Sequence, residues 1–286
     1  MVSGGGAAAV WGKTVGLFSP PETTHARAAS ADPELERQSP QKQAEILLER
    51  AVTRTDQGTT QDEDQSPNPS KVQIDARLDR WRGKLKMDKQ LGDLTTVALN
   101  SNDQSLRASA IEVQLAAYGL TKRESTVDAL VQRAGSSDHA QKIWALWTLG
   151  LLGNRGIETD RVVRVLVAHL KDSSRNSDDD ARRWAVEGLA LVGTTSTIVP
   201  LLNAMHDDPS PIVRERAACS LAESGMLTHD QRLAAVPQLI NFSDDPALDA
   251  QTRAWAFQAL TDITKQHLPN DSTAWRNWYR DRGSQN

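Results

Sequence analysis

The feature that most constrains the fold is a twelve-residue segment that occurs four times without a gap. The ends of successive copies lie 40, 32 and 39 residues apart, and a related segment ends at Gly119. A period of this length is typical of solenoids, in which each unit buries its apolar face against its neighbours. The copies are KIWALWTLGLLG (142–153), RRWAVEGLALVG (182–193), RERAACSLAESG (214–225) and RAWAFQALTDIT (253–264).

The positions of the repeat divide into a core set and a polar set. Positions four, five and eight lie on one face of a helix and are small or apolar in every copy, which predicts that they are buried. Alanine at position four predicts a close approach of neighbouring helices. Position one is basic and follows an aspartate by four residues in three copies, which predicts an ion pair within each helix. The alanines are Ala145, Ala185, Ala217 and Ala256, the basic residues Lys142, Arg182, Arg214 and Arg253, and the aspartates Asp138, Asp178 and Asp249.

Each copy follows an acidic polar turn, and a second apolar helix is expected between the copies. Asp and Ser side chains in such turns accept hydrogen bonds from the first N–H groups of a helix. We therefore expect an all-α protein, an α-α superhelix that forms a solenoid of about six helical hairpins over residues 71–286. It should begin with a pair at 72–87 and 89–100 and end with a lid of Trp275, Trp278 and Tyr279.

The residues before this array differ in composition. Residues 1–39 are rich in Gly, Ala, Ser, Pro and Thr, which predicts a disordered tail or the remnant of an anchor. Residues 40–57 predict a single amphipathic helix, and the polar, acidic residues 58–70 predict a linker. No apolar run approaches the ~18 residues of a membrane span. As written, the sequence predicts a cytoplasmic chain, and the alternative is a cell-envelope-anchored one if the natural start lies further upstream.

The pattern of an Asp/Pro turn, a basic residue and then A-x-x-x-L-x-x-x-G resembles the HEAT repeat. RERAACSLAESGM and the closing DSTAWRNWY resemble bacterial HEAT-repeat proteins in particular, and the resemblance covers 71–286. It implies a helical solenoid that serves as a protein-binding scaffold, because most such arrays do. Some proteins that are similar in fold are enzymes, namely DNA glycosylases that act on alkylated bases and bilin lyases.

The residue types that usually carry catalysis are scattered along the chain. The six histidines never stand at metal-ligand spacing, and we expect no metal, no cofactor and no enzymatic activity. Cys219 stands between small residues, which favours a buried thiol. Residues 71–286 carry 27 basic and 27 acidic side chains, so nucleic acid is not the expected partner, because phosphate binding requires a basic excess.

The leading hypothesis is a scaffold whose second helices line an inner groove for another protein or a peptide. Tryptophans form another candidate set, because they share repeat positions with charged residues and should be at least half exposed. They either pack between hairpins or form an aromatic surface for a peptide or an exposed base. The rival hypothesis is a HEAT-like DNA glycosylase or a bilin lyase-type enzyme. The candidate partner-binding residues are Arg133, Arg164, Asn203, Arg232 and Asn241 on the second helices, and Trp144, Trp147 and Trp184 on the copies.

Overall fold

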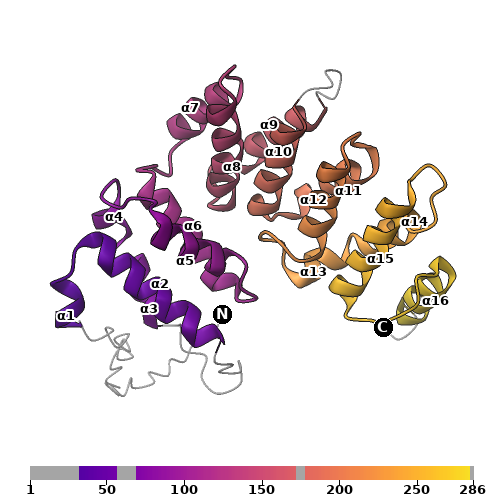
Figure 1. Cartoon of the computed structure of the whole chain (residues 1–286), viewed down its shortest axis with the longest axis horizontal. Helices are drawn as coiled ribbons and strands as arrows, with labels where there is room; N and C mark the ends of the chain where they lie inside the picture. The colour runs from indigo at the N-terminus through magenta and orange to yellow at the C-terminus, as the bar shows by residue number, and fades with distance from the viewer. Residues whose placement is uncertain (1–31, 57–68, 172–177, 284–286) are drawn as a thin grey trace, which may run out of the picture.

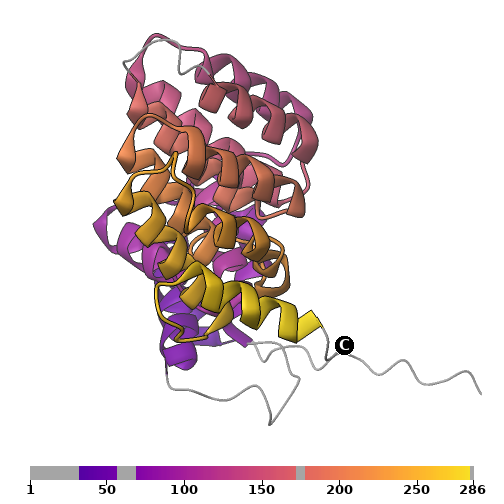
Figure 2. The same cartoon turned by 90° about the vertical axis from the view of Figure 1, so that its right-hand side faces the viewer.

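The computed structural model describes residues 32–56, 69–171 and 178–283, and the regular structure of these residues is entirely helical. The prediction of an all-α protein is therefore confirmed. Successive helices form an arch (Figure 1), and the view turned by 90° in Figure 2 shows the helices stacked one above another. The arch has two halves, each with its own hydrophobic core. The first core is built from residues between Leu35 and Ala116, and the second core from residues between Ile111 and Trp275.

The first half of the arch includes residues that the sequence patterns place outside the array. Leu47 and Leu48 are fully buried and share the first core with Ile74, Trp81 and Leu91. The helix expected at 40–57 is thus an integral part of the fold. This half contains α1 (Pro33–Glu36), α2 (Pro40–Asp56), α3 (Pro69–Asp75), α4 (Leu78–Trp81), α5 (Lys89–Leu99) and α6 (Gln104–Ala117).

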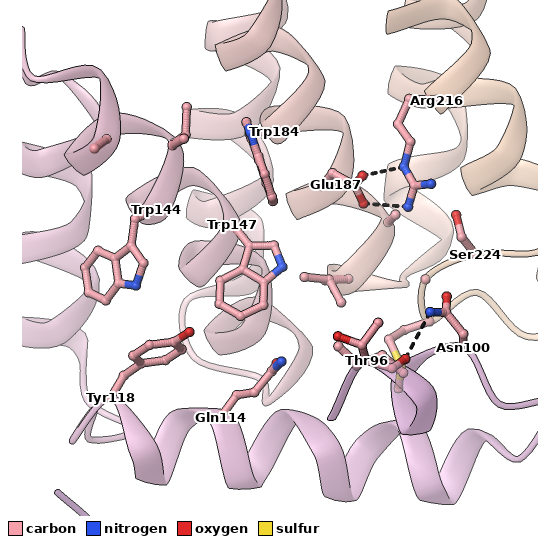
Figure 3. Close-up of a pocket in the computed structure, with 17 residues that line it drawn as sticks. Thr96, Asn100, Gln114, Tyr118, Trp144, Trp147, Trp184, Glu187, Arg216 and Ser224 are labelled. Carbon is pink, nitrogen blue, oxygen red and sulfur yellow. Dashed lines mark hydrogen bonds and ion pairs between the residues drawn. The ribbon is translucent and has the colours of Figure 1, made fainter. Parts of the chain in front are cut away.

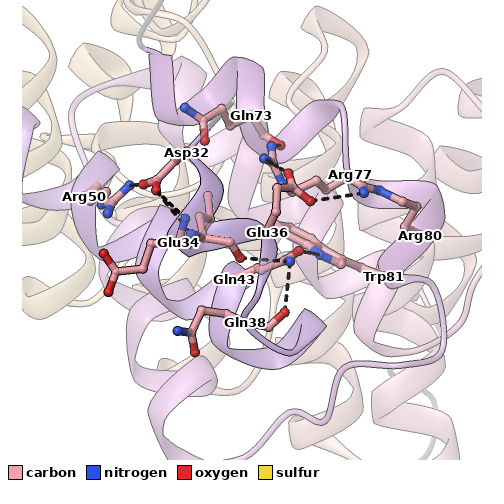
Figure 4. A network of polar contacts seen from close by, with 11 residues as sticks. Asp32, Glu34, Glu36, Gln38, Gln43, Arg50, Gln73, Arg77, Arg80 and Trp81 are labelled. Atoms are coloured by element: carbon pink, nitrogen blue, oxygen red, sulfur yellow. Dashed lines mark hydrogen bonds and ion pairs between the residues drawn. The ribbon is translucent and has the colours of Figure 1, made fainter. Parts of the chain in front are cut away.

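A polar network attaches α1 to this core (Figure 4). The Gln43 side chain donates hydrogen bonds to the carbonyls of Leu35 (3.1 Å) and Gln38 (3.0 Å) and accepts one from the Trp81 indole (3.1 Å). The buried Arg77 forms an ion pair with Glu36. Residues 32–39 therefore differ from the disorder expected for 1–39, because one buried leucine and specific polar partners hold a segment that has no apolar periodicity. Residues 1–31 and 57–68 lie outside the described residues.

The stretch 72–87 is not the single helix that the spacing predicts. It contains the end of α3 and the four-residue α4, separated by Ala76 and Arg77. In the first half, α5 packs against both α6 and α2, and α2 also packs against α3. Ile74 of α3 and Trp81 of α4 both contribute to the first core.

The second half consists of helix pairs arranged in two rows (Figure 1). The outer row faces away from the hollow of the arch, and the inner row, which holds the four repeat copies, faces the hollow. The last element is α16 (Ser272–Gly283). The outer row comprises α7 (Glu124–Ala134), α9 (Thr159–Lys171), α11 (Ile198–Asp207, after the 3-10 turn Thr195–Thr197) and α14 (Val236–Phe242), and the inner row α8 (His139–Asn154), α10 (Asp179–Val192), α12 (Pro211–Ala222) and α15 (Ala250–Thr264), with α13 (His229–Leu233) before α14.

The inner row is closely packed at the small residues of the repeat. All four alanines at position four are 0% exposed, as predicted. Among the inner-row helices, α8 and α10 approach each other most closely. A Cβ added to Gly150 would stand 2.5 Å from the carbonyl oxygen of Gly188. A Cβ added to Gly188 would stand 2.7 Å from the Leu146 carbonyl oxygen. These two helices therefore pack backbone against backbone.

In the first three copies the basic residue at position one pairs with the next repeat, and in the fourth Arg253 donates to the carbonyls of Asp245 and Leu248, so the predicted intrahelical pairs are wrong. Lys142 contacts Asp178 (2.7 Å), and Arg214 contacts Asp249 (2.9 Å). Arg182 contacts Asp208 through two bonds of 2.8 and 3.2 Å, and both side chains are buried. We call this series the ladder. The aspartates also cap helices, since Asp178 accepts a bond from the Ala181 N–H (3.0 Å) and Asp249 from that of Thr252 (3.0 Å).

The far end of the second core is covered as expected. Trp275 is 0% exposed, and its indole donates a hydrogen bond to the Pro269 carbonyl (3.1 Å). Trp278 meets Trp275 edge to face at 5.9 Å, while Tyr279 remains exposed. The predicted aromatic lid is confirmed for its first two members, and α16 closes the array.

Enlarging the alanines of the inner row should destabilise the protein. We expect Ala185→Leu and Ala217→Leu each to lower the free energy of unfolding by about 1–3 kcal/mol, because added methylene groups must displace a packed neighbouring helix. Urea denaturation measures this change. The exposed Ala168 serves as the matched site, where leucine should have almost no effect. Equal effects at all three positions would contradict the packing described.

Breaking the buried ion pair of the ladder should lower the free energy of unfolding more than breaking a half-exposed one. Arg182→Met leaves the Asp208 carboxylate buried without its partner, and the free energy of unfolding should fall by about 3–5 kcal/mol. Lys142→Met removes the half-exposed rung to Asp178 and should cost at most about 1 kcal/mol. Urea denaturation of both variants checks the difference, and a smaller loss for Arg182→Met than for Lys142→Met would refute it.

Candidate functional site

The most distinctive hollow of the described residues lies where the two halves of the arch meet. It has a volume of about 490 Å³ and is bounded by α6 on one side, by α8 and α10 on the other, and by the turn after α12. We call it the aromatic pocket (Figure 3). Its lining includes Tyr118 from the end of α6, Trp144 and Trp147 from α8, and Trp184 from α10.

The pocket arises because α6 belongs mainly to the other half. Most buried apolar residues of α6 belong to the first core, and α6 contributes only Ile111 and Leu115 to the buried residues of the second core. The helix packs against α3, α4 and α5, whereas α10 packs against its inner-row neighbours α8 and α12. The regular stacking of the inner row therefore does not extend to α6. A wedge-shaped space is left between α6 and the row.

The turn of residues 223–226, which we call the closing turn, shuts this space at one end. The Met226 N–H donates a hydrogen bond to the Ala190 carbonyl at the end of α10 (2.8 Å). The Gln104 side chain of α6 donates one to the Met226 carbonyl (2.7 Å). Gly225 has φ +79°, and an added Cβ would lie 2.4 Å from the Ala190 carbonyl oxygen, so only glycine fits. The closing turn thus touches both halves of the arch.

Two buried arginines hold the closing turn. Arg107 of α6 donates to the carbonyls of Glu223 (3.3 Å), Gly225 and Ser101. Arg232 of α13 donates to carbonyls of the last turn of α12, of the closing turn and of Leu227, at 2.8–3.1 Å. Burial, with the charge of Arg107 nearby, lowers the pKa of Arg232 to about 10. Burial likewise lowers the pKa of Arg107.

Arg232 is therefore not the outward-facing residue that the sequence predicts. It is 6% exposed, and its guanidinium is occupied by backbone carbonyls. The prediction treats residues 232–240 as one second helix, but α13 ends at Leu233 and α14 starts at Val236. This break changes the face on which Arg232 lies. Its role in the structure is to cap α12, whose terminal carbonyls lack helical partners.

The aromatic side chains of the pocket form a rigid cluster. Tyr118 meets Trp144 at a centroid distance of 5.8 Å and an interplanar angle of 83°, and it meets Trp147 at 5.9 Å and 89°. Such edge-to-face pairs are favourable beyond the area that they bury. The guanidinium of Arg133 lies 5.5 Å from the Trp144 ring centroid. Burial raises the pKa of the Tyr118 hydroxyl, which stays neutral at physiological pH.

The polar groups of the pocket lie beside this cluster. Glu187 and Arg216 form a two-pronged ion pair at 2.5 and 2.7 Å. Gln114 is only 5% exposed, and its Oε1 has no hydrogen-bond partner among the described residues. The Ser224 hydroxyl is also buried without a partner in the described part of the chain. A buried polar atom without a partner is rare and indicates a group that a ligand or water can satisfy.

The structure separates the sequence-predicted site residues into two groups. Trp144, Trp147 and Trp184 share the aromatic pocket, and their other sides pack against the second core. The predicted inner groove of second helices is wrong, because those helices form the outer row (Figure 1). Periodicity identifies the polar face of each helix but not the direction in which the array curves. The residues on the outer row are Arg133, Arg164, Asn203 and Asn241, all exposed, of which only Arg133 reaches the aromatic cluster.

Sequence reasoning missed half of the pocket. Glu187 and Arg216 occupy the same repeat positions as the tryptophans, so the alignment contained a signal for them. Thr96, Asn100 and Gln114 come from the first half, and no repeat position marks them. Their place in the pocket depends on how the two halves meet, which no local pattern encodes.

A second hollow of about 520 Å³ continues beyond Arg216 and the closing turn. Cys219 lies there and is exposed, so the prediction of a buried thiol is wrong. Partial desolvation raises the pKa of this thiol, which disfavours the reactive thiolate. Burial, with the charge of Glu223, also raises the pKa of Asp262. In residues 32–56, 69–171 and 178–283, no cluster of three or more His, Cys, Asp or Glu forms a metal site, and no helix has the length and apolar character to cross a membrane.

Comparison with known families identifies a stretch that runs from before the second repeat copy into the fourth. Residues 174–261 match the family described as HEAT repeats. This part of the chain is therefore a HEAT-repeat domain. No curated protein matches it. Among solved structures, it is similar to the crystal structure of an engineered protein, with 17% identity, coverage of 79% of this chain and 90% of that one, and a TM-score of 0.33.

Removing the arginine that joins α6 to the closing turn should loosen the HEAT-repeat array at the pocket. Arg107→Met leaves buried carbonyls of Glu223 and Gly225 without this donor, and the free energy of unfolding should fall by about 1–3 kcal/mol. Hydrogen exchange of residues 223–226 should accelerate as well. The exposed Arg80 is the control, because Arg80→Met removes only a surface ion pair. Unchanged exchange in the closing turn of Arg107→Met would contradict its role as a link.

Proposed function

We propose that this protein is a non-enzymatic scaffold that binds another protein or a peptide at the aromatic pocket. The observation that carries the proposal is the convergence of four aromatic side chains with a buried, unpartnered glutamine in one hollow. Tryptophan, tyrosine and arginine are the residues most often found at energetic centres of protein interfaces. HEAT-repeat solenoids commonly bind proteins, and their curved surfaces suit extended ligands.

The pocket is a better candidate than the outer row. Arg164, Asn203 and Asn241 are single exposed polar residues on three different helices. Exposed residues of this kind contribute little to binding energy, because solvent competes for their contacts. The pocket instead offers rigid rings on both α8 and α10, which lose little conformational freedom when a ligand binds.

One observation bears on the rival glycosylase hypothesis. The structure places an acid, Glu187, beside Trp147 and Trp184, and an enzyme acting on a damaged base would use an acid and aromatic rings. The carboxylate is, however, neutralised by the fork of Arg216. The balanced charge of residues 71–286 also provides no excess of cations for the phosphates of duplex DNA. These features favour the scaffold.

Affinity capture from an extract of the source cells, with the full chain immobilised, tests this proposal. Trp147→Ala and Trp184→Ala should each lower the amount of a captured partner at least about tenfold, because they remove rings at the centre of the pocket. Arg164→Ala and Asn203→Ala should retain it. Each variant is checked for an unchanged circular dichroism spectrum.

Two outcomes would refute the scaffold. The first is a partner whose capture depends on Arg164 and Asn203 but not on the tryptophans. The second is release of methylated bases from duplex DNA, abolished by Trp184→Ala or Glu187→Gln. Salt-dependent DNA binding without base release would also count against it if that binding required the pocket.

A further inference from the structure

The free polar groups of the aromatic pocket are mostly hydrogen-bond donors. In Figure 3 the indole nitrogen of Trp147 and the hydroxyl of Tyr118 point toward the interior of the pocket. Neither group has a hydrogen-bond partner among the described residues. An indole N–H can only donate, and a neutral phenol donates readily. A fitting ligand therefore presents acceptors, such as backbone carbonyls, toward these rings.

The two charged side chains of the pocket form an ion pair with each other. Glu187 and Arg216 are the charged residues of its lining, and they neutralise each other through two contacts of 2.5 and 2.7 Å. A cationic or an anionic ligand would have to compete with this bidentate pair, which is among the stronger polar contacts in proteins. The pocket therefore favours a ligand without charge at the contact.

The shape of the lining favours compact apolar rings. Tyr118 stands at 83° to Trp144 and at 89° to Trp147, so the three rings present both faces and edges to the hollow. At 5.8 and 5.9 Å these rings contact one another, so a pyrrolidine ring packs against the surface that the cluster presents to the hollow. Aromatic-lined grooves of this kind bind proline-rich segments in the polyproline II conformation, which is preformed and loses little entropy on binding.

Gln114 adds one acceptor to this set of donors. Its side chain extends from α6 toward Trp147, and its Oε1 is buried without a partner in the described part of the chain. Proline has no backbone N–H, whereas every other residue has one. An N–H from a residue between two prolines would satisfy Gln114, and the remaining carbonyls would accept from Trp147 and Tyr118.

We infer that the aromatic pocket binds a proline-rich peptide segment in the polyproline II conformation, with non-proline residues between the prolines. The inference rests on the proposed function as a protein-binding scaffold and names the chemistry of the bound segment. Its pyrrolidine rings pack against the surface that Tyr118, Trp144 and Trp147 present to the hollow. Its carbonyls accept from the free donors, and Gln114 recognises one N–H.

Fluorescence anisotropy of labelled decapeptides with the full chain tests the inference. The probes are a decamer in which two prolines are separated by two alanines, a decamer of proline alone, and a decamer of glycine and serine. Both proline peptides should bind at least about tenfold more tightly than the glycine–serine peptide, and Trp147→Ala should remove that difference. Gln114→Leu should weaken the first peptide several-fold and leave the all-proline peptide unchanged, because only the first peptide offers internal N–H groups.

Trp255→Ala is the matched control variant. Trp255 occupies the same repeat position as Trp144 and Trp184 and is half-buried, but it does not line the pocket. Its replacement should change the affinity for either proline peptide by less than about twofold. An equal loss in Trp255→Ala and Trp147→Ala would overturn the inference, and so would equal binding of all three peptides. Displacement of the proline peptides by a maltooligosaccharide or by a ten-nucleotide oligothymidylate would overturn it as well.

Failure of this inference can be told apart from failure of the proposed function. If the captured partner requires Trp147 but cross-links to the pocket through a segment without proline, the scaffold stands and the polyproline inference fails. If no partner requires Trp147 and no proline peptide binds, both fail. A captured partner that cross-links through a proline-rich segment supports both.

Discussion

The contact between the two halves of the arch depends on the backbone carbonyls at the C-terminal end of α12. A helix end leaves its last carbonyls without intrahelical partners, and buried carbonyls require donors. Arg232 supplies donors from the second half, and Arg107 supplies them from α6. Both guanidinium groups give up hydration, as the lowered pKa of each indicates, and carbonyl bonds replace that hydration.

This junction lies at one end of the aromatic pocket. Arg107 and Gln104 tie α6 to the closing turn, while α6 packs mainly on the first core and so lacks the backbone-to-backbone contact that joins α8 to α10. The space between them stays open and receives the rings of Tyr118, Trp144 and Trp147. The same closing turn presents Ser224 to the pocket. The side chains proposed to bind a partner therefore lie at the point where the regular stacking of the repeats ends.

Within the second half, the ladder and the close packing of small residues keep the inner-row helices in register. Equivalent repeat positions consequently stand side by side on the concave surface. Positions three and six carry tryptophans on α8 and then Trp184 and Glu187 on α10, but Arg216 and Cys219 on α12. From α8 to α12 these positions thus change from aromatic to polar, and the ion pair of Glu187 with Arg216 lies at the change.

The sequence by itself determined the helical repeats, the buried alanines at position four and the tryptophan lid of α16, because helix periodicity and side-chain size act locally and recur in every copy. It also indicated that Trp144, Trp147 and Trp184 keep one side free of the core. Only the tertiary structure decided that the ladder joins successive repeats, that Arg232 is buried and that the second helices face outward. Only the tertiary structure, too, brought Gln114 and Tyr118 opposite those tryptophans. These outcomes depend on contacts between residues far apart in the chain, whose geometry follows from how whole helices pack and from where backbone carbonyls need donors.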